Sequence, residues 1–168
     1  VESIIPCKLA ALFLPKNGRG SFFAPFLCSI SGILEVYKMK TIQLTPSCKD
    51  YLWGGEKLRT EYGIQSELHP LSEAWMLSCH PDGPSYLPDG STFQQYINTH
   101  PGCLGTHCEK FSEFPVLAKL IDAKKDLSIQ VHPSNEYALE HEHQYGKTEM
   151  WYVLEAEPGA SLYYGFTH

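Results

Sequence analysis

Apolar and polar residues alternate along residues 127–132, and this alternation predicts a β-strand. In the segment LSIQVH every second side chain is apolar, and a strand sends alternate side chains to opposite faces. The polar face then carries Ser128, Gln130 and His132. An antiparallel strand with one solvated face has the same pattern, so these residues alone favour a polar surface over a ligand site.

Short strand patterns outnumber helical ones in the rest of the chain. Strands are predicted at 41–44, 72–78 and 114–123, and as two runs within 147–166 that are joined by the Pro-Gly break at 157–159. Helical patterns occur as a turn within 54–63, a helix at 91–102 with Ser91 as N-cap, and a short helix that Ser134 begins. Many short strands with close turn signals favour a mainly β barrel or sandwich.

Residues 1–38 differ from the rest and show no sustained helical or strand periodicity. Their longest apolar stretch, FFAPFLCSISGILEV, is broken by Pro25 and is too short to span a bilayer. From Met39 the sequence is typical of a bacterial protein start. We therefore predict that residues 39–168 form the domain and that residues 1–38 are an extension that does not belong to it and comes from upstream translation or fusion. The alternative is a genuine N-terminal extension that packs on the domain.

Size and charge exclude some classes of partner. A chain of 168 residues with 43% apolar residues suits one globular domain. The net charge of -6 gives no basic field for nucleic acid or an anionic membrane, while a small anionic substrate would need a local cluster of Lys or Arg. Six scattered cysteines favour reduced thiols in the cytoplasm. Cys103, His107 and Cys108 lack the second pair of a zinc knuckle and are interpreted as loop residues.

A second strand pattern supplies possible partners for Gln130 and His132. In KTEMWYV, alternation places Lys147, Glu149 and Trp151 on one face. If this strand lies near residues 127–132 in a small barrel, Gln130, His132 and Glu149 converge as three nitrogen and oxygen donors. Such donors suit zinc, with iron or manganese as alternatives. The spacing alone is a weak signal.

Several segments together resemble one enzyme family. LSIQVHP, GKTEMWYVL, LYYGF, SEAWMLS and FPVLAKLIDA are similar to type I phosphomannose isomerases, in the compact form of Gram-positive bacteria, from about Met39 onward. The resemblance implies a cupin-type jelly-roll barrel, of which this chain would be the N-terminal part. It also implies one zinc ion per chain and the interconversion of mannose 6-phosphate and fructose 6-phosphate through an enediol.

The resemblance assigns roles residue by residue. It implies that the zinc ligands are Gln130, His132 and Glu149. The implied active-site cations are Lys119 and Lys147. The implied substrate contacts are Ser128, Glu73 and Trp75. From the residues alone, the preferred interpretation is that Lys119 reaches the rim of a barrel, and Lys147 with Glu149 could be an exposed ion pair.

One ligand of the family pattern is missing from the chain. The family's fourth zinc ligand is a histidine on a later segment, and His168 does not match its position. We therefore expect the chain to be incomplete at its C-terminal side, with weak zinc binding and poor isomerase activity. The alternative is a non-catalytic cupin module that binds metal or sugar.

Overall fold

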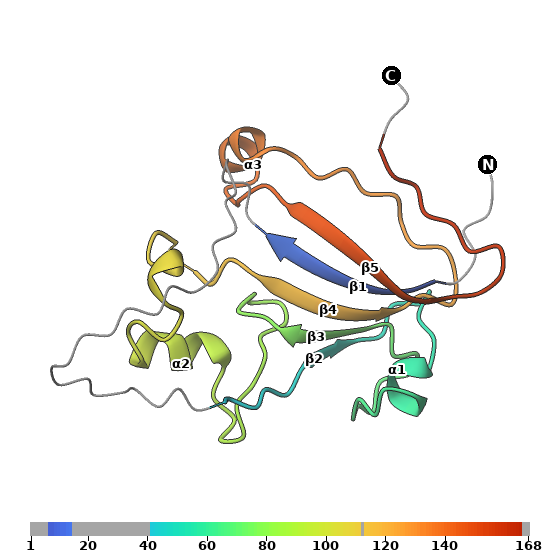
Figure 1. Ribbon diagram of the computed structural model, residues 1–168, viewed down its shortest axis with the longest axis horizontal. Helices are drawn as coiled ribbons and strands as arrows, with labels where there is room; N and C mark the ends of the chain where they lie inside the picture. Colours follow the sequence, from blue (N-terminus) through green and yellow to red (C-terminus); the bar gives the residue numbers. More distant parts are fainter. Residues whose placement is uncertain (1–6, 15–40, 112, 166–168) are drawn as a thin grey trace, which may run out of the picture.

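The computed structural model describes residues 7–14, 41–111 and 113–165, with residues 7–14 described by their backbone alone. Within these ranges five strands form one sheet in the order β2-β3-β4-β1-β5, and every neighbouring pair is antiparallel (Figure 1). The strands are β1 (Cys7–Leu14), β2 (Ser47–Lys49), β3 (Glu73–Leu77), β4 (Leu117–Asp122) and β5 (Thr148–Ala156).

Three short α-helices and one 3-10 helix, within the same described ranges, lie outside the sheet: α1 (Lys57–Thr60), α2 (Phe93–Thr99), η1 (Thr106–Cys108) and α3 (Asn135–His141). The predicted N-cap Ser134 of α3 is confirmed, because its side chain accepts a hydrogen bond from the backbone N–H of Tyr137. The predicted cap of α2 is wrong by one residue. Thr92 and Gln95 form a capping box, while the Ser91 hydroxyl donates to Asp89.

One face of the sheet packs against α1 and the loop that follows it. Leu58, Ile64, Leu71 and Ala74 form a buried cluster there. Close approach of the chain before α1 depends on Gly55, where a Cβ atom would lie 2.3 Å from Oδ2 of Asp122. That same oxygen accepts a hydrogen bond of 2.7 Å from the backbone N–H of Lys57, which fixes the start of α1 against β4.

The opposite face carries a smaller apolar cluster around Ile121, with Trp53, Leu117, Trp151 and Ala160 packed against it. The sheet is open, because β2 and β5 are its two edges. The prediction of a mainly β chain with short helices is therefore confirmed, but a closed jelly-roll barrel is not seen in the described residues. The face around Ile121 is the one that bears the polar site residues.

Three predicted strands are wrong. Residues 41–44 are irregular, Thr45 forms an isolated bridge with Tyr86, and strand β2 begins at Ser47, which lies opposite Trp75 of β3. Residues 127–132 form no strand, and the side chains predicted to be buried there are exposed, with Ile129 at 74% and Val131 at 69%. Residues 160–165, the second half of the predicted hairpin, are also not a strand. Alternation makes a strand possible, but only a neighbouring strand can supply its hydrogen bonds.

The segment predicted to lie outside the family domain contributes β1. This strand lies between β4 and β5, although residues 1–38 show no sustained strand pattern. The rest of that extension lies outside the described residues, and a native start at Met39 stays a prediction. Among the helices of the described ranges, none is both long and apolar enough to cross a membrane.

Candidate functional site

Polar residues from three strands share the face of the sheet around Ile121. Trp75 of β3 lies opposite Lys119 of β4. One residue of β1 lies between Lys119 and Trp151 of β5 and is opposite both of them. Residues two apart on a strand point to the same face. Glu73 and Glu149 therefore lie on the face that carries Lys119, Trp75 and Trp151.

Glu73, Trp75 and Lys119 form a buried polar cluster. The Nζ atom of Lys119 lies 3.1 Å from Oε2 of Glu73, and the indole N–H of Trp75 donates to the same oxygen at 2.6 Å. The Lys119 ammonium also lies 4.4 Å from the centre of a Trp75 ring, in cation–π range. Both charged side chains are almost buried, so the cation has a fixed position within the site. Lys119 therefore does not extend to solvent at the sheet's rim.

His132, Lys147 and Glu149 form a second cluster. Nε2 of His132 lies 2.5 Å from Oε2 of Glu149, and Nζ of Lys147 lies 3.7 Å from that oxygen. The Glu149 side chain is 12% exposed and that of Lys147 is 34% exposed. The pair of Lys147 and Glu149 is therefore not the fully exposed surface pair that was one interpretation of the sequence.

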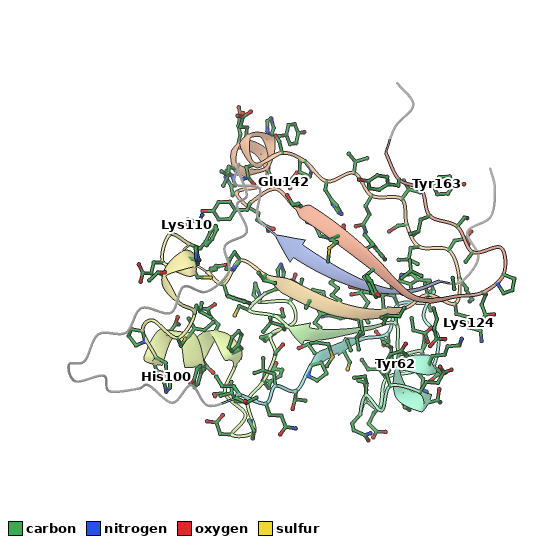
Figure 2. The ribbon with its side chains drawn as sticks, in the orientation of Figure 1. Tyr62, His100, Lys110, Lys124, Glu142 and Tyr163 are labelled. Atoms are coloured by element: carbon green, nitrogen blue, oxygen red, sulfur yellow. The ribbon has the colours of Figure 1, made fainter. Side chains whose placement is uncertain are left out.

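Gly146 allows the His132 segment to reach the start of β5. A Cβ atom on this buried glycine would lie 2.6 Å from the carbonyl oxygen of Pro133 and 2.7 Å from the backbone nitrogen of Asn135. Only a residue without a side chain permits this approach. The stretch after β4 runs back toward α3 along the β5 side of the sheet (Figure 1), and in Figure 2 the labels Lys124 and Glu142 mark its beginning and the end of α3.

The two clusters influence each other electrostatically at Lys147. Burial lowers the pKa of Lys147 below its usual value, because the charged ammonium loses hydration. Glu149 opposes this shift, Lys119 adds to it by like-charge repulsion, and Glu73 opposes it. Both clusters therefore belong to one charged site.

Two residues of the predicted site lie apart from these contacts. Ser128 and Gln130 are exposed, and the amide of Gln130 donates to the Ser128 hydroxyl at 3.1 Å. The structure thus brings His132 and Glu149 together but does not bring Gln130 to them. Gln130 lies in a segment whose backbone is irregular and is not part of a strand. The strand alternation that would place its side chain on the same face as that of His132 therefore does not apply.

Two further residues contact the site and were missed in the sequence. Nζ of Lys49 lies 4.8 Å from the centre of a Trp75 ring. Tyr51 lies close enough to Glu73 for that carboxylate to raise the tyrosine pKa, after the larger effect of burial. Lys49 is the last residue of the short strand β2 and Tyr51 follows it. The three residues of β2 are too few to show a pattern that would have identified either residue.

Some side chains of the site are of the types that bind metal ions. Among the described residues, no group of three or more His, Cys, Asp or Glu side chains could hold a metal ion. His132 and Glu149 bring an imidazole nitrogen and a carboxylate oxygen to within 2.5 Å of each other, and both are donor types that zinc accepts.

Comparison with known proteins adds independent information about relatives. The family model described as phosphomannose isomerase type I, catalytic domain, matches residues 41–158. A mannose-6-phosphate isomerase of Streptococcus mutans is 42% identical over 118 residues, which cover 68% of this chain and 37% of that protein. A mannose-6-phosphate isomerase of Bacillus subtilis is 34% identical over 125 residues, covering 71% of this chain and 39% of its own length.

A solved structure is also similar. The crystal structure of the mannose 6-phosphate isomerase from Bacillus subtilis aligns with a TM-score of 0.57 at 37% sequence identity. The alignment covers 62% of this chain and 34% of that one. The chain therefore spans well under half the length of these relatives.

Proposed function

The chain belongs to the type I phosphomannose isomerase family, and from this premise we propose that its site serves the interconversion of mannose 6-phosphate and fructose 6-phosphate. The observation that carries the proposal is the convergence of an imidazole, a carboxylate and two lysines on one face of the sheet. An aldose-ketose isomerisation moves a proton between C1 and C2 while negative charge develops on oxygen. A partly buried site with two lysine ammonium groups, each beside a carboxylate, suits this demand.

We propose that His132 and Glu149 hold a zinc ion and that Gln130 is a third ligand. Their contact of 2.5 Å supports a shared ligand point. Gln130 lies two residues from His132, and its contact with Ser128 is an exposed hydrogen bond, which costs little to exchange. When bound, zinc would polarise the sugar oxygens as a Lewis acid. Iron or manganese accept the same donors.

The chain's own cations would act on the substrate directly. Lys119 would stabilise negative charge on a substrate oxygen, with its ammonium oriented by Glu73 and by the ring of Trp75. Lys147 would contribute a second positive charge from the His132 side of the site. Rotation of Gln130 toward the metal would free the Ser128 hydroxyl for a sugar hydroxyl. Glu73 and Trp75 would thereby position a cation and line the site.

Metal binding can be tested without relying on activity. Zinc titrated into the metal-free chain in a calorimeter is expected to bind at one site. Glu149→Gln and His132→Ala should each weaken binding by about tenfold or more, since each removes a ligand. The matched control is His141→Ala, because His141 is an exposed histidine on α3. Equal effects of His132→Ala and His141→Ala would contradict the proposed zinc site.

Turnover separates the enzyme from the alternative module. The chain spans 37% and 39% of two mannose-6-phosphate isomerases. The second candidate is a non-catalytic module that binds metal or sugar. In a coupled assay with mannose 6-phosphate, we expect slow turnover that Lys119→Met abolishes. Saturable binding of the sugar phosphate with no turnover would favour the module.

The thiols support a reducing compartment. Cys48, Cys79, Cys103 and Cys108 are free in the described part of the chain. Disulfides persist in oxidising compartments and are rare in the cytosol. We therefore propose a cytoplasmic location, which fractionation of the producing cells would test.

A further inference from the structure

Lys49 is a third lysine on the face of the sheet that carries the site. It lies opposite Glu73 in the pairing of β2 with β3, and directly opposed residues share a face. Its Nζ atom lies 4.8 Å from the centre of a Trp75 ring, and that of Lys119 lies 4.4 Å from the centre of a Trp75 ring. Figure 1 shows β3 between β2 and β4. The indole of Trp75 is therefore contacted by one ammonium from each neighbouring strand.

The Lys49 ammonium also holds the loop that follows β3. Its Nζ atom donates to the backbone carbonyl of Asp82 at 2.5 Å. The next residue, Gly83, lies against the indole, because a Cβ atom there would be 2.6 Å from Cε3 of Trp75. His80, earlier in this loop, packs edge-on to Trp75 with ring centres 5.6 Å apart. Lys49 and the loop together therefore restrict where the indole can lie.

The charge of Lys49 is placed differently from the charges of the other two lysines of the site. Lys119 pairs with Glu73, and Lys147 pairs with Glu149. Within the described part of the chain, the Lys49 side chain contacts an aromatic ring and a backbone carbonyl. The residue is partly buried, and a cation over an indole is an attractive contact. These contacts suit a lysine that holds its neighbours in place.

We propose that Lys49 is a positioning residue for Lys119 and that it acts through Trp75. The indole N–H donates to Oε2 of Glu73 at 2.6 Å. The same oxygen lies 3.1 Å from Nζ of Lys119. A fixed indole therefore fixes the carboxylate, and the carboxylate fixes the ammonium that pairs with it. Lys49 itself need not touch the substrate.

The consequence for catalysis rests on the proposed function, in which Lys119 stabilises negative charge on a substrate oxygen. Such stabilisation depends on where the cation stands when the charge develops. A misplacement of about 1 Å can reduce the rate by roughly a hundredfold, even when the change lies far from the reacting atoms. Loss of Lys49 should therefore affect the chemical step more than substrate binding.

The position of Lys119 over the indole can be measured by NMR without any activity. Protons above the face of an aromatic ring are shifted upfield by its ring current. In protein labelled with ¹³C-lysine, the ε-methylene signal of Lys119 is the one lost in Lys119→Arg. We expect this signal upfield of the Lys57 signal, because Lys57 belongs to a surface ion pair with Glu157.

Three variants then test the role of Lys49. Lys49→Met removes the ammonium and should move the Lys119 signal toward that of Lys57. Lys49→Arg keeps the charge and the hydrogen-bond donors and should retain most of the upfield shift. Lys57→Met is the matched control and should leave the Lys119 signal in place. A Lys119 signal that is unchanged in Lys49→Met, or that moves equally in Lys57→Met, would overturn the proposal.

Turnover of mannose 6-phosphate separates this inference from the proposed function. We expect Lys49→Met to lower kcat by about tenfold or more, with a smaller change in KM, and Lys49→Arg to retain most of kcat. An unchanged kcat in Lys49→Met, beside an active wild-type chain, would refute a positioning role in the reaction. No turnover by the wild-type chain would contradict the proposed function instead, and the NMR signals would still decide whether Lys49 positions Lys119.

Discussion

Replacing Lys119 by methionine would remove a buried cation and leave the carboxylate of Glu73 without its ion-pair partner. Methionine keeps the length of the side chain and much of its packing over Trp75. The two charged side chains are only 11% and 9% exposed and lie 3.1 Å apart. Water therefore cannot replace the lost cation as it does at a surface pair.

The expected loss of stability follows from this burial. At an effective dielectric constant of about 20, charges at this distance attract by roughly 5 kcal/mol, before the cost of desolvation is subtracted. Removing one partner of a buried pair costs about 3–5 kcal/mol. The Trp75 N–H stays bound to Glu73 at 2.6 Å, which favours the lower end. We expect Lys119→Met to reduce the free energy of unfolding by about 3 kcal/mol.

A surface pair of equal length is the control. Lys57 and Glu157 are also 3.1 Å apart, but their side chains are 38% and 55% exposed. Lys57→Met should therefore cost no more than about 1 kcal/mol. Urea unfolding followed by circular dichroism measures both variants by linear extrapolation.

A double variant tests the coupling between the two charges. Lys119→Met/Glu73→Gln removes both charges and should be less destabilised than the sum of the single variants, by about 2 kcal/mol. Additive losses, or equal losses from Lys119→Met and Lys57→Met, would refute the reasoning that burial makes this pair strong.

Three further predictions concern packing, thiol chemistry and a helix cap. Gly54→Ala should lower the melting temperature, because the new Cβ would lie 2.5 Å from Cβ of Ser72, and overpacking costs about 1–3 kcal/mol; an unchanged melting temperature would contradict it. Burial raises the pKa of Cys79 to about 11, so at pH 8 its thiolate fraction is about a hundredfold below that of a thiol with the usual pKa of 9.0. Timed alkylation with peptide mapping should therefore modify the exposed Cys103 first, and the rate at Cys79 should rise as pH increases toward 11. Thr92→Ala should cost about 1 kcal/mol in urea unfolding, because it removes the capping box of α2; a loss near zero would show that the cap contributes little.

Local pattern was sufficient for elements whose signals lie within a few residues. The N-cap Ser134, the strands β3 and β4, and most of β5 follow from cap chemistry and side-chain periodicity. Alternation also predicted that Glu149 shares a face with Trp151. Family resemblance predicted that Glu73 and Lys119 belong to the site, and the structure brings these two side chains together.

Pairing between distant segments required the tertiary structure. The segment 127–132 has perfect alternation but no neighbouring strand within the described part of the chain, and Gln130 stays exposed and apart from His132. The segment 7–14 has a poorer strand pattern but lies between two strand edges, and there it becomes β1. Side-chain periodicity is a property of adjacent residues and was therefore determined by the sequence alone. A strand's hydrogen bonds come from residues far along the chain, so the tertiary structure decided which segment became a strand and which site residues met.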